Sequence, residues 1–358
     1  MASRSIAYPR RSGVTVGVDT HGEIHVAAAF TSDLGRPLGH LEVATTPAGY
    51  RSLLTWARRL GDEPQFGLEG TGSYGAGLAR FLHDAGCPVF EVNRPNRQTR
   101  HARGKSDPVD AEAAARAVLS GEATAVAKRD DDRVGMIRSL RVARRSAVKT
   151  NTQIINQIRA LIVTAPAQLR EQLRCLSGEQ LIDTAASLRP GPITNPSAAV
   201  KLALKGLAKR HQLLADEAAV LDVQLARLTA EAAPALCAVL GVGSDVAGAL
   251  LAAVGDNPER MRSEGTFAHL CGVAPLPASS GKTTGRHRLS RGGDRQANGA
   301  LWRIVMVRPA CHQPTKDYMA RRTQEGLSKK EIVRCLKRYV ARDLYRILVP
   351  TKQLRVAA

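Results

Sequence analysis

The sequence predicts an α/β fold for the N-terminal part of the chain and a mainly helical fold for the rest. Two observations carry this prediction. Short apolar runs rich in β-branched residues alternate with helical apolar spacing in roughly the first 93 residues, whereas helical spacing dominates after about residue 131. A chain of 358 residues is long enough for about two domains, each with its own core.

Three strands open the predicted N-terminal domain, and a helix, a strand, a second helix and a last strand follow. The strands are expected at residues 14–20, 24–30, 37–45, 64–70 and 88–93, and the helices at residues 47–60 and 74–86. Three consecutive strands before the alternation begins are typical of the RNase H-like arrangement, whereas a doubly wound dinucleotide-binding domain alternates strands and helices throughout. No G-x-G-x-x-G motif follows the first strand.

A long basic amphipathic helix is expected over residues 131–164. Its apolar positions are interleaved with cations, among them Arg138, Arg141, Arg144 and Arg145. Two interpretations stay open, because such a face either lines a groove for nucleic acid or is only the solvated side of a core helix.

A heptad pattern follows a loop rich in proline and glycine. Leu207, Leu214, Leu221 and Leu228 lie seven residues apart, which predicts a coiled-coil seam of about three heptads. The pattern fits a helical hairpin within the chain and a zipper between chains equally well, and a zipper would assemble an oligomer.

The last region is expected to be mainly α-helical. It begins near Pro234, and its GVG sequence at 241–243 separates two apolar helical segments, as in a helix-hairpin-helix element or in a plain helix connection. The predicted domains are an RNase H-like domain at 12–165, a helical coiled-coil linker at 166–232 and a C-terminal domain at 233–358.

The charge balance calls for a polyanionic partner. Lys and Arg number 52 against 32 Asp and Glu, so the net charge is +20. The cations recur along the chain, which indicates phosphate-binding surfaces on folded domains. No apolar run approaches the roughly 18 residues needed to cross a bilayer, and the N-terminus lacks the apolar core of a secretory signal. We therefore expect a soluble protein of the cytoplasm.

Four acids from three separate segments are candidate metal ligands. Asp19 and Glu69 end the first and fourth predicted strands, which are neighbours in an RNase H-like sheet, and Asp107 and Asp110 begin a helix. Converging carboxylates suit Mg²⁺, or Mn²⁺, held against a phosphate for phosphoryl transfer. Helix capping is the alternative for the pair, with Asp107 as N-cap and Asp110 as the acid of a capping box.

A second candidate site lies in the segment 272–301, where small residues and serines are followed by cations. A serine hydroxyl among guanidinium groups is placed to attack phosphorus, since the cations stabilise the pentavalent state. The alternative is a phosphate-binding loop whose serines only donate hydrogen bonds. The candidate nucleic-acid ligands of this segment, to which Lys105 is added, are Lys282, Arg286, Arg288, Arg291 and Arg295.

The motifs in this order resemble the insertion-sequence one-ten family of transposases. They are GVDTHG, LEGTGSYG, GKSDPVDAEAAARA, GVGSDVAGALLAAVGD and PLPASSGKTTGRHRLSRGGDRQAN. The chain departs from the family where many members carry Lys-Arg-Gly after the serine loop, because Ser290-Arg291-Gly292 stands there. This turn therefore carries one basic residue fewer than it does in those members.

The resemblance implies a RuvC-like domain whose acids Asp19, Glu69, Asp107 and Asp110 bind Mg²⁺, and a C-terminal transposase domain. Ser280 would be the nucleophile that forms a covalent phosphoserine with DNA, although the adjacent Ser279 is an alternative. A noncoding bridge RNA would pair with donor and target DNA, and the protein would act as a homo-oligomer, a dimer or a tetramer.

Three functions remain as hypotheses at this point. The first is an RNA-guided DNA recombinase that uses both sites, and the second is a structure-selective endonuclease that uses the carboxylates and water without a covalent intermediate. The third is a nucleic-acid packaging protein, for which the charge alone would suffice.

Overall fold

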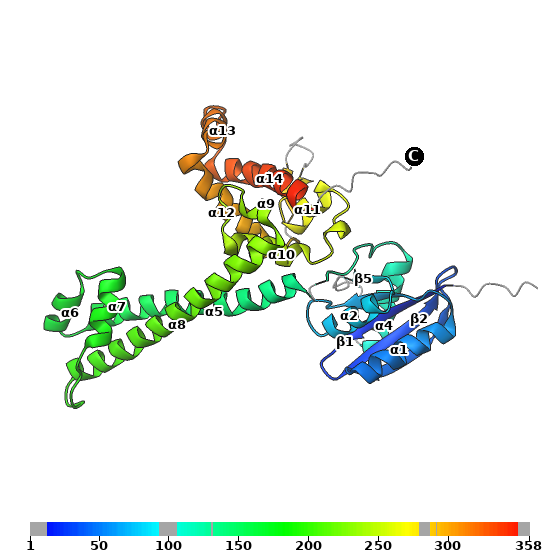
Figure 1. Cartoon of the computed structure of the whole chain (residues 1–358), viewed down its shortest axis with the longest axis horizontal. Coiled ribbons are helices and arrows are strands. Elements are labelled where there is room, and N and C mark those ends of the chain that lie inside the picture. Colours follow the sequence, from blue (N-terminus) through cyan, green and yellow to red (C-terminus); the bar gives the residue numbers. More distant parts are fainter. Residues whose placement is uncertain (1–12, 93–105, 130–131, 279–286, 291, 350–358) are drawn as a thin grey trace, which may run out of the picture. The chain divides into compact units, whose positions relative to one another are not determined.

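The computed structural model describes residues 13–92, 106–129, 132–278, 287–290 and 292–349. The chain divides into two compact units, Met1–Arg129 and Asp130–Ala358 (Figure 1). The first is a sheet covered by helices, and the second is almost entirely helical.

A five-stranded mixed sheet is the centre of the first unit. Its strands are β1 (Val14–Thr20), β2 (Ile24–Thr31), β3 (Pro37–Ala44), β4 (Gln65–Glu69) and β5 (Val89–Val92). They lie in the order β3-β2-β1-β4-β5, with β2 antiparallel to β1 and β3, and with β1, β4 and β5 parallel. The predicted element order and the predicted pairing of the first strand with the fourth are both confirmed.

Helices cover both faces of this sheet. The helices of the first unit are α1 (Pro47–Leu60), α2 (Ala76–Asp84) and α4 (Asp107–Leu119). Val16 and Val18 of β1 are buried in the same cluster as Leu53 of α1 and Leu82 of α2. Side chains alternate between the two faces of a strand. On the opposite face of β2, Val26 and Phe30 pack against α4.

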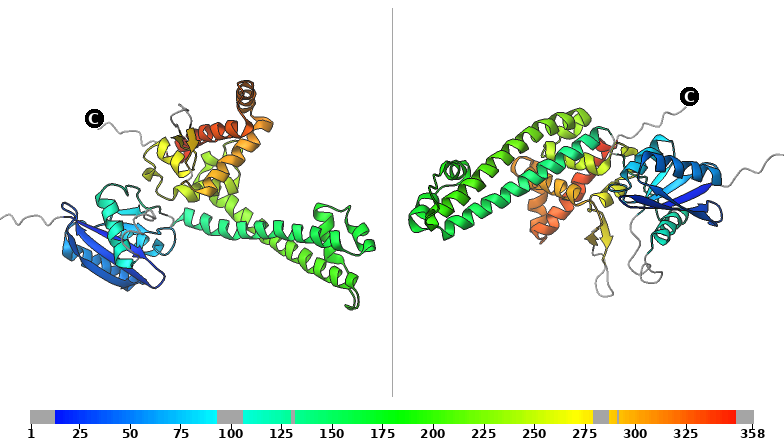
Figure 2. Two further views of the ribbon diagram at one scale, coloured as in Figure 1. Left: turned by 180° about the vertical axis from the view of Figure 1, so that it is seen from behind. Right: turned by 90° about the horizontal axis from the view of Figure 1, so that it is seen from below.

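An antiparallel pair of long helices opens the second unit. These are α5 (Arg133–Thr164) and α8 (Pro196–Ala232), and α6 (Ala167–Leu173) and α7 (Gly178–Ser187) lie between them in the chain. The pair lies side by side in Figures 1 and 2. Leu225 and Leu228 are buried, and Leu207 and Leu214 pack against the cluster that contains Ile158 of α5. The heptad seam therefore packs within the chain.

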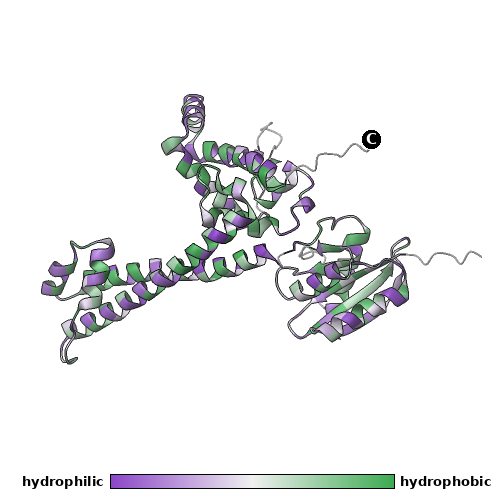
Figure 3. Ribbon diagram, viewed as in Figure 1, coloured by the Kyte–Doolittle hydropathy of each residue, from purple (hydrophilic) through white to green (hydrophobic). Residues whose placement is uncertain are grey.

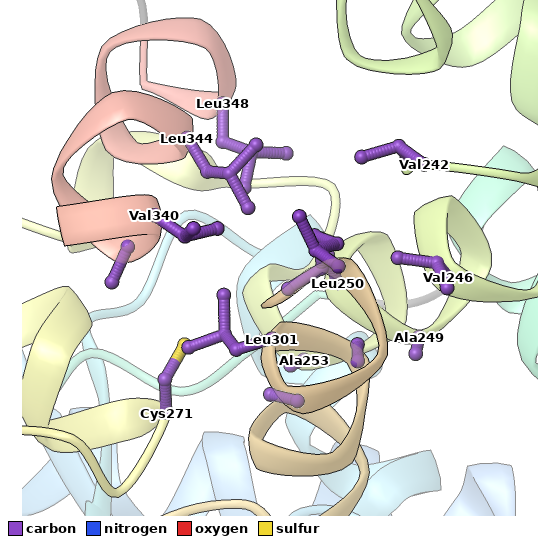
Figure 4. Packing of buried hydrophobic residues seen from close by; sticks show 14 of the residues in the cluster. Val242, Val246, Ala249, Leu250, Ala253, Cys271, Leu301, Val340, Leu344 and Leu348 are labelled. Atoms are coloured by element: carbon purple, nitrogen blue, oxygen red, sulfur yellow. The ribbon is translucent and has the colours of Figure 1, made fainter. Parts of the chain in front are cut away.

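The remaining elements form a helical body with one small hairpin. They are α9 (Pro234–Cys237), α10 (Ser244–Val254), a 3-10 helix (Pro258–Arg260), α11 (Glu264–Leu270), β6 (Pro275–Pro277), β7 (His287–Leu289), α12 (Arg295–Cys311), α13 (Gln313–Gln324) and α14 (Lys329–Leu348). Figure 4 shows Leu250 of α10 and Leu344 of α14 among the buried side chains of this body. The expected turn at 241–243 connects α9 to α10, although α9 is a single turn.

Hydropathy follows this packing in both units. In Figure 3 the strands of the sheet are largely hydrophobic and α13 is largely hydrophilic. Among the described residues, no helix combines the length and the apolar character that crossing a membrane requires. The predicted combination of an α/β N-terminal part and a mainly helical C-terminal part is confirmed.

Candidate metal centre

Asp19 and Glu69 lie at the ends of two neighbouring parallel strands. The ladder between β1 and β4 runs to the pair Val18 and Leu68, and the two acids are the next residue on each strand. Val18 and Leu68 face the core under α1 and α2, so the acids face the other side of the sheet, where α4 packs. The carboxylates are largely buried, with 7% of Asp19 and 8% of Glu69 exposed.

Two glycines allow α4 to lie almost directly on the sheet. A Cβ atom added to Gly17 of β1 would come 2.1 Å from the carbonyl oxygen of Ala111, and one added to Gly67 of β4 would come 2.9 Å from that of Ala114. The alanines that α4 presents to the sheet are small, and Ala111, Ala114 and Ala115 are fully buried. Glycine and alanine together bring the N-terminal turn of α4 close to the strand that carries Asp19.

The first turn of α4 provides the other two acids. Asp110 is 6% exposed, and Asp107, three residues earlier, lies on the same side of the helix. The alternative prediction that Asp107 is the N-cap is wrong, because the N-cap is Ser106, whose side chain makes no capping hydrogen bond. The Asp107 carboxylate is directed instead toward the imidazole of His21, with Oδ1 3.6 Å from Nε2.

His21 is a site residue that the sequence reasoning missed. Its Nε2 lies 3.1 Å from Oδ2 of Asp19, and one ligand atom each from Asp19, His21 and Asp107 lie within 4.8 Å of one another. Its position two residues after Asp19 was the available signal, because residues i and i+2 of an extended segment project to the same side. Among the residues that the structure describes, the group that can share an ion therefore consists of two carboxylates and one imidazole, and it does not include Glu69 or Asp110.

The surroundings fix the two strand ends and leave the group accessible. The Thr20 hydroxyl donates a hydrogen bond to the backbone oxygen of Glu69 at 2.9 Å, which joins the end of β1 to the end of β4. Gly70 turns the chain sharply after Glu69 with a φ of 63°, in the left-handed region that glycine adopts without strain. A cavity of about 390 Å³ is lined by His21 and Asp107 among others, so one side of the group is open.

The donor set fits a divalent cation that prefers oxygen. Asp19 is buried and Asp107 is half-exposed. Neighbouring carboxylates repel one another unless a cation or a proton neutralises them. Mg²⁺ and Mn²⁺ bind carboxylate oxygens and keep open positions for water or phosphate. What the described residues bring together thus agrees in chemistry with a metal centre for phosphoryl transfer.

The candidate nucleophiles lie outside the described residues. Ser279 and Ser280 are in this category, and so are four of the expected nucleic-acid ligands: Lys105, Lys282, Arg286 and Arg291. The segment that contains the serines is flanked by β6 and β7, which pair antiparallel. This hairpin was not predicted from the sequence.

A hydrogen-bonded chain anchors the start of β6. The side-chain amide of Asn298 donates to the carbonyl oxygens of Cys271 at 2.8 Å and Gly272 at 3.1 Å. Its amide oxygen accepts a hydrogen bond from Nζ of Lys337 at 3.0 Å, and this lysine is buried in α14. Burial lowers the pKa of Lys337. The backbone that leads into the serine segment is therefore tied to two helices.

The expected basic face of α5 separates into paired and exposed arginines. Arg141 is 7% exposed, and its guanidinium donates to Asp245 and to Gln296, both at 3.2 Å. Arg144 binds Asp222 of α8. These two side chains cross-link the second unit and are not offered to a ligand, whereas Arg145 is exposed and Arg138 is half-buried. Arg288 on β7 and Arg295 at the start of α12 are also exposed.

Asp245 is the common partner of three arginines. Burial alone would raise the pKa of Asp245, but hydrogen bonding to Arg303 and the charges of Arg141 and Arg144 outweigh burial and lower this pKa. A carboxylate that stays ionised at the N-terminus of α10 neutralises the cations that would otherwise repel one another at this point of the core.

Two family models match the chain over the regions that contain both candidate sites. Residues 16–165, which include all four acids, match a transposase model for the DEDD domain of IS110 elements. Residues 233–320, which include the serine segment, match the transposase IS116/IS110/IS902 family. The two matches together cover about two thirds of the chain. The sequence matches no curated protein.

Proposed function

The chain belongs to the IS116/IS110/IS902 family of transposases. From this premise we propose that it moves an insertion sequence. Two cooperating sites would carry out the reaction, a Mg²⁺-binding acidic centre and a serine nucleophile. Membership makes the protein an enzyme that cleaves and rejoins DNA, with a DEDD-type domain that implies a divalent metal ion. The agreement between the family match and the group formed by Asp19, His21 and Asp107 carries the proposal.

The N-terminal unit is proposed to be RNase H-like. The spatial strand order β3-β2-β1-β4-β5 supports this proposal. On one side of β1 lie β2 and β3, which continue the sheet by antiparallel pairing, and on the other side lie β4 and β5, which pair in parallel. In this interpretation the acids lie where β1 and β4 end, and ligands of open α/β sheets are commonly held at such carboxyl ends.

The four acids Asp19, Glu69, Asp107 and Asp110 are the proposed metal ligands. Bound Mg²⁺ or Mn²⁺ would supply positive charge to the phosphate oxygens. Asp19 and Asp107 each lie close to Nε2 of His21, and Glu69 and Asp110 are buried on the same side of the sheet.

Ser280 is the proposed nucleophile, with Ser279 as the alternative. The hydroxyl oxygen attacks phosphorus, a serine–phosphate bond forms, and the bond from phosphorus to the leaving deoxyribose oxygen breaks, so that this oxygen takes up a proton. Because one phosphoester replaces another, the strand can be rejoined by the reverse attack. Support comes from the match of residues 233–320 and from the cations of the same segment.

DNA, donor and target, is the substrate, and the guide is proposed to be a bridge RNA. The exposed cations that remain as candidate phosphate ligands are Arg145, Arg288 and Arg295. With Arg138 and the basic residues outside the described ranges, they would bind backbone phosphates. A dimer or tetramer is proposed on the resemblance to the family.

Trapping the protein on DNA tests the proposal. Full-length protein is incubated with bridge RNA, Mg²⁺ and a nicked DNA substrate, and covalent adducts are mapped by mass spectrometry. The expected result is a phosphoserine at 280 that is absent in Ser280→Ala and in Asp19→Asn but present in Ser279→Ala.

The other outcomes identify the alternatives. An adduct at Ser279 would transfer the nucleophilic role to that residue. Cleavage without any adduct, abolished by Asp19→Asn and unaffected by Ser280→Ala, would instead identify a metal-dependent endonuclease that uses water.

A further inference from the structure

An imidazole lies within the acidic centre, beside the carboxylates of Asp19 and Asp107. His21 follows β1 directly, and its Nε2 is 3.1 Å from Oδ2 of Asp19 and 3.6 Å from Oδ1 of Asp107. His21 also lines the cavity of about 390 Å³ next to the carboxylates, together with Asp107. Its nitrogen is therefore as close to the two carboxylate oxygens as a further ligand would be.

The distances fit adjacent corners of one coordination shell. Octahedral ligands with bonds of about 2.1 Å to their metal ion are about 3.0 Å apart at adjacent corners. The separation of 3.1 Å between His21 Nε2 and Asp19 Oδ2 matches this spacing, and the separation of 3.6 Å from Asp107 Oδ1 requires a shift of only about 0.6 Å. An ion held by Asp19 and Asp107 would thus have the imidazole nitrogen within coordination distance.

A buried neighbour fixes the backbone of His21. Nδ1 of His25 accepts a hydrogen bond of 3.3 Å from the backbone N–H of His21. His25 is fully buried, pairs with Thr20 in the β1–β2 ladder, and stacks on Tyr50 with ring centroids 5.8 Å apart and 2° between the planes. The turn that presents His21 is therefore held by the core and not by the solvent side.

We propose that His21 is a direct ligand of the divalent ion, so that the centre combines carboxylates with one imidazole. The inference rests on the proposed metal site and deepens it. A nitrogen donor raises the affinity for transition-metal ions more than the affinity for Mg²⁺, which prefers oxygen. The centre therefore selects Mn²⁺ over Mg²⁺ more strongly than four carboxylates would.

Electron paramagnetic resonance of Mn²⁺ bound to the full-length protein tests this ligand directly. A coordinated imidazole nitrogen modulates the electron spin echo, and the modulation changes when histidine is labelled with ¹⁵N. The expected result is nitrogen modulation in the wild type that responds to the label, and its loss in His21→Ala and His21→Asn. The labelled wild type shows whether a histidine is a ligand at all, and two different substitutions at position 21 keep the assignment testable even if one of them disturbs folding.

His40→Ala is the matched control. Nε2 of His40 lies 3.1 Å from Oε1 of Glu112, and its side chain is 43% exposed against 47% for His21, so its removal deletes an equivalent histidine–carboxylate pair in the same unit. The control is expected to keep the nitrogen modulation. In a titration of free Mn²⁺, His21→Ala is expected to weaken binding about 10-fold or more, while His40→Ala stays at wild-type affinity.

The outcomes separate this inference from the proposed function. Mn²⁺ that binds the wild type but not Asp19→Asn, without nitrogen modulation, would overturn the role of His21 and leave the acidic centre intact. Absence of any Mn²⁺ binding that depends on Asp19 would overturn both.

Discussion

Replacing Gly17 by alanine is expected to displace α4 and with it half of the acidic centre. The new Cβ atom would lie 2.1 Å from the carbonyl oxygen of Ala111 and 2.2 Å from the backbone nitrogen of Ala115. Carbon atoms in ordinary contact are about 3.5 Å from their neighbours, so the helix must retreat by about 1.4 Å. Because both obstructing atoms are backbone, a side-chain rotation cannot relieve the overlap.

Two quantities should change together in Gly17→Ala. Overpacking of this kind costs about 1–3 kcal/mol of unfolding free energy, and a misplacement of about 1 Å at a catalytic centre lowers the rate about 10²-fold. Thermal unfolding and the rate of Mg²⁺-dependent DNA cleavage measure the two effects. The control is Gly13→Ala, directly before β1, where the nearest heavy atom to a new Cβ lies 3.4 Å away. A Gly17→Ala protein with wild-type melting temperature and cleavage rate would show that the contact of α4 with Gly17 does not position the acids.

Three further predictions concern the second unit and the nucleic acid. Asn298→Ala removes the hydrogen bonds to Cys271 and Gly272 and leaves Lys337 without this acceptor. The free energy of unfolding, measured in urea, should therefore fall by about 2–3 kcal/mol, and an unchanged midpoint would exclude the anchoring role. The folded-state pKa of Asp245 is lowered, so its contribution is full above its unfolded pKa of about 3.9 and is lost as pH falls through the lower folded pKa. The stability advantage of the wild type over Asp245→Asn, about 3 kcal/mol at pH 7, should therefore shrink only below about pH 4, and an advantage that disappears by pH 6 would contradict this cause. Affinity for DNA should fall about 10³-fold between roughly 50 and 200 mM salt if about six phosphates are bound. Fluorescence anisotropy at several salt concentrations measures this, and an affinity that does not change with salt would contradict binding to the phosphates.

Hydrophobic periodicity was enough to predict the elements of the first unit and the neighbouring positions of Asp19 and Glu69 at two strand ends. The alternation in VTVGVDT and FGLEG defines two buried strands, and the strand order brings Asp19 next to Glu69. The role of Gly17 and Gly67 was not predictable, because only the packed helix shows which backbone atoms approach these positions.

The features that sequence reasoning missed depend on contacts between distant residues. Arg141 belongs to a charged face by its spacing, but Asp245, 104 residues later, binds it in the interior. The hairpin of β6 and β7 consists of three-residue strands, which are too short to give a periodic signal. His21 stands beside a predicted ligand, yet a lone histidine after a strand acquires a metal-binding geometry only when Asp107 approaches from α4.

The proposed function requires Asp19, Glu69, Asp107 and Asp110 to hold a divalent ion in one place. Crystals of the full-length protein grown with Mn²⁺ and measured at the manganese absorption edge test it most directly, because anomalous scattering locates the metal without assumptions about the ligands. We expect an anomalous peak within coordination distance of Asp19 and Asp107, between the ends of β1 and β4 and the first turn of α4. Manganese bound elsewhere, with these four carboxylates directed away from it, would exclude this metal site.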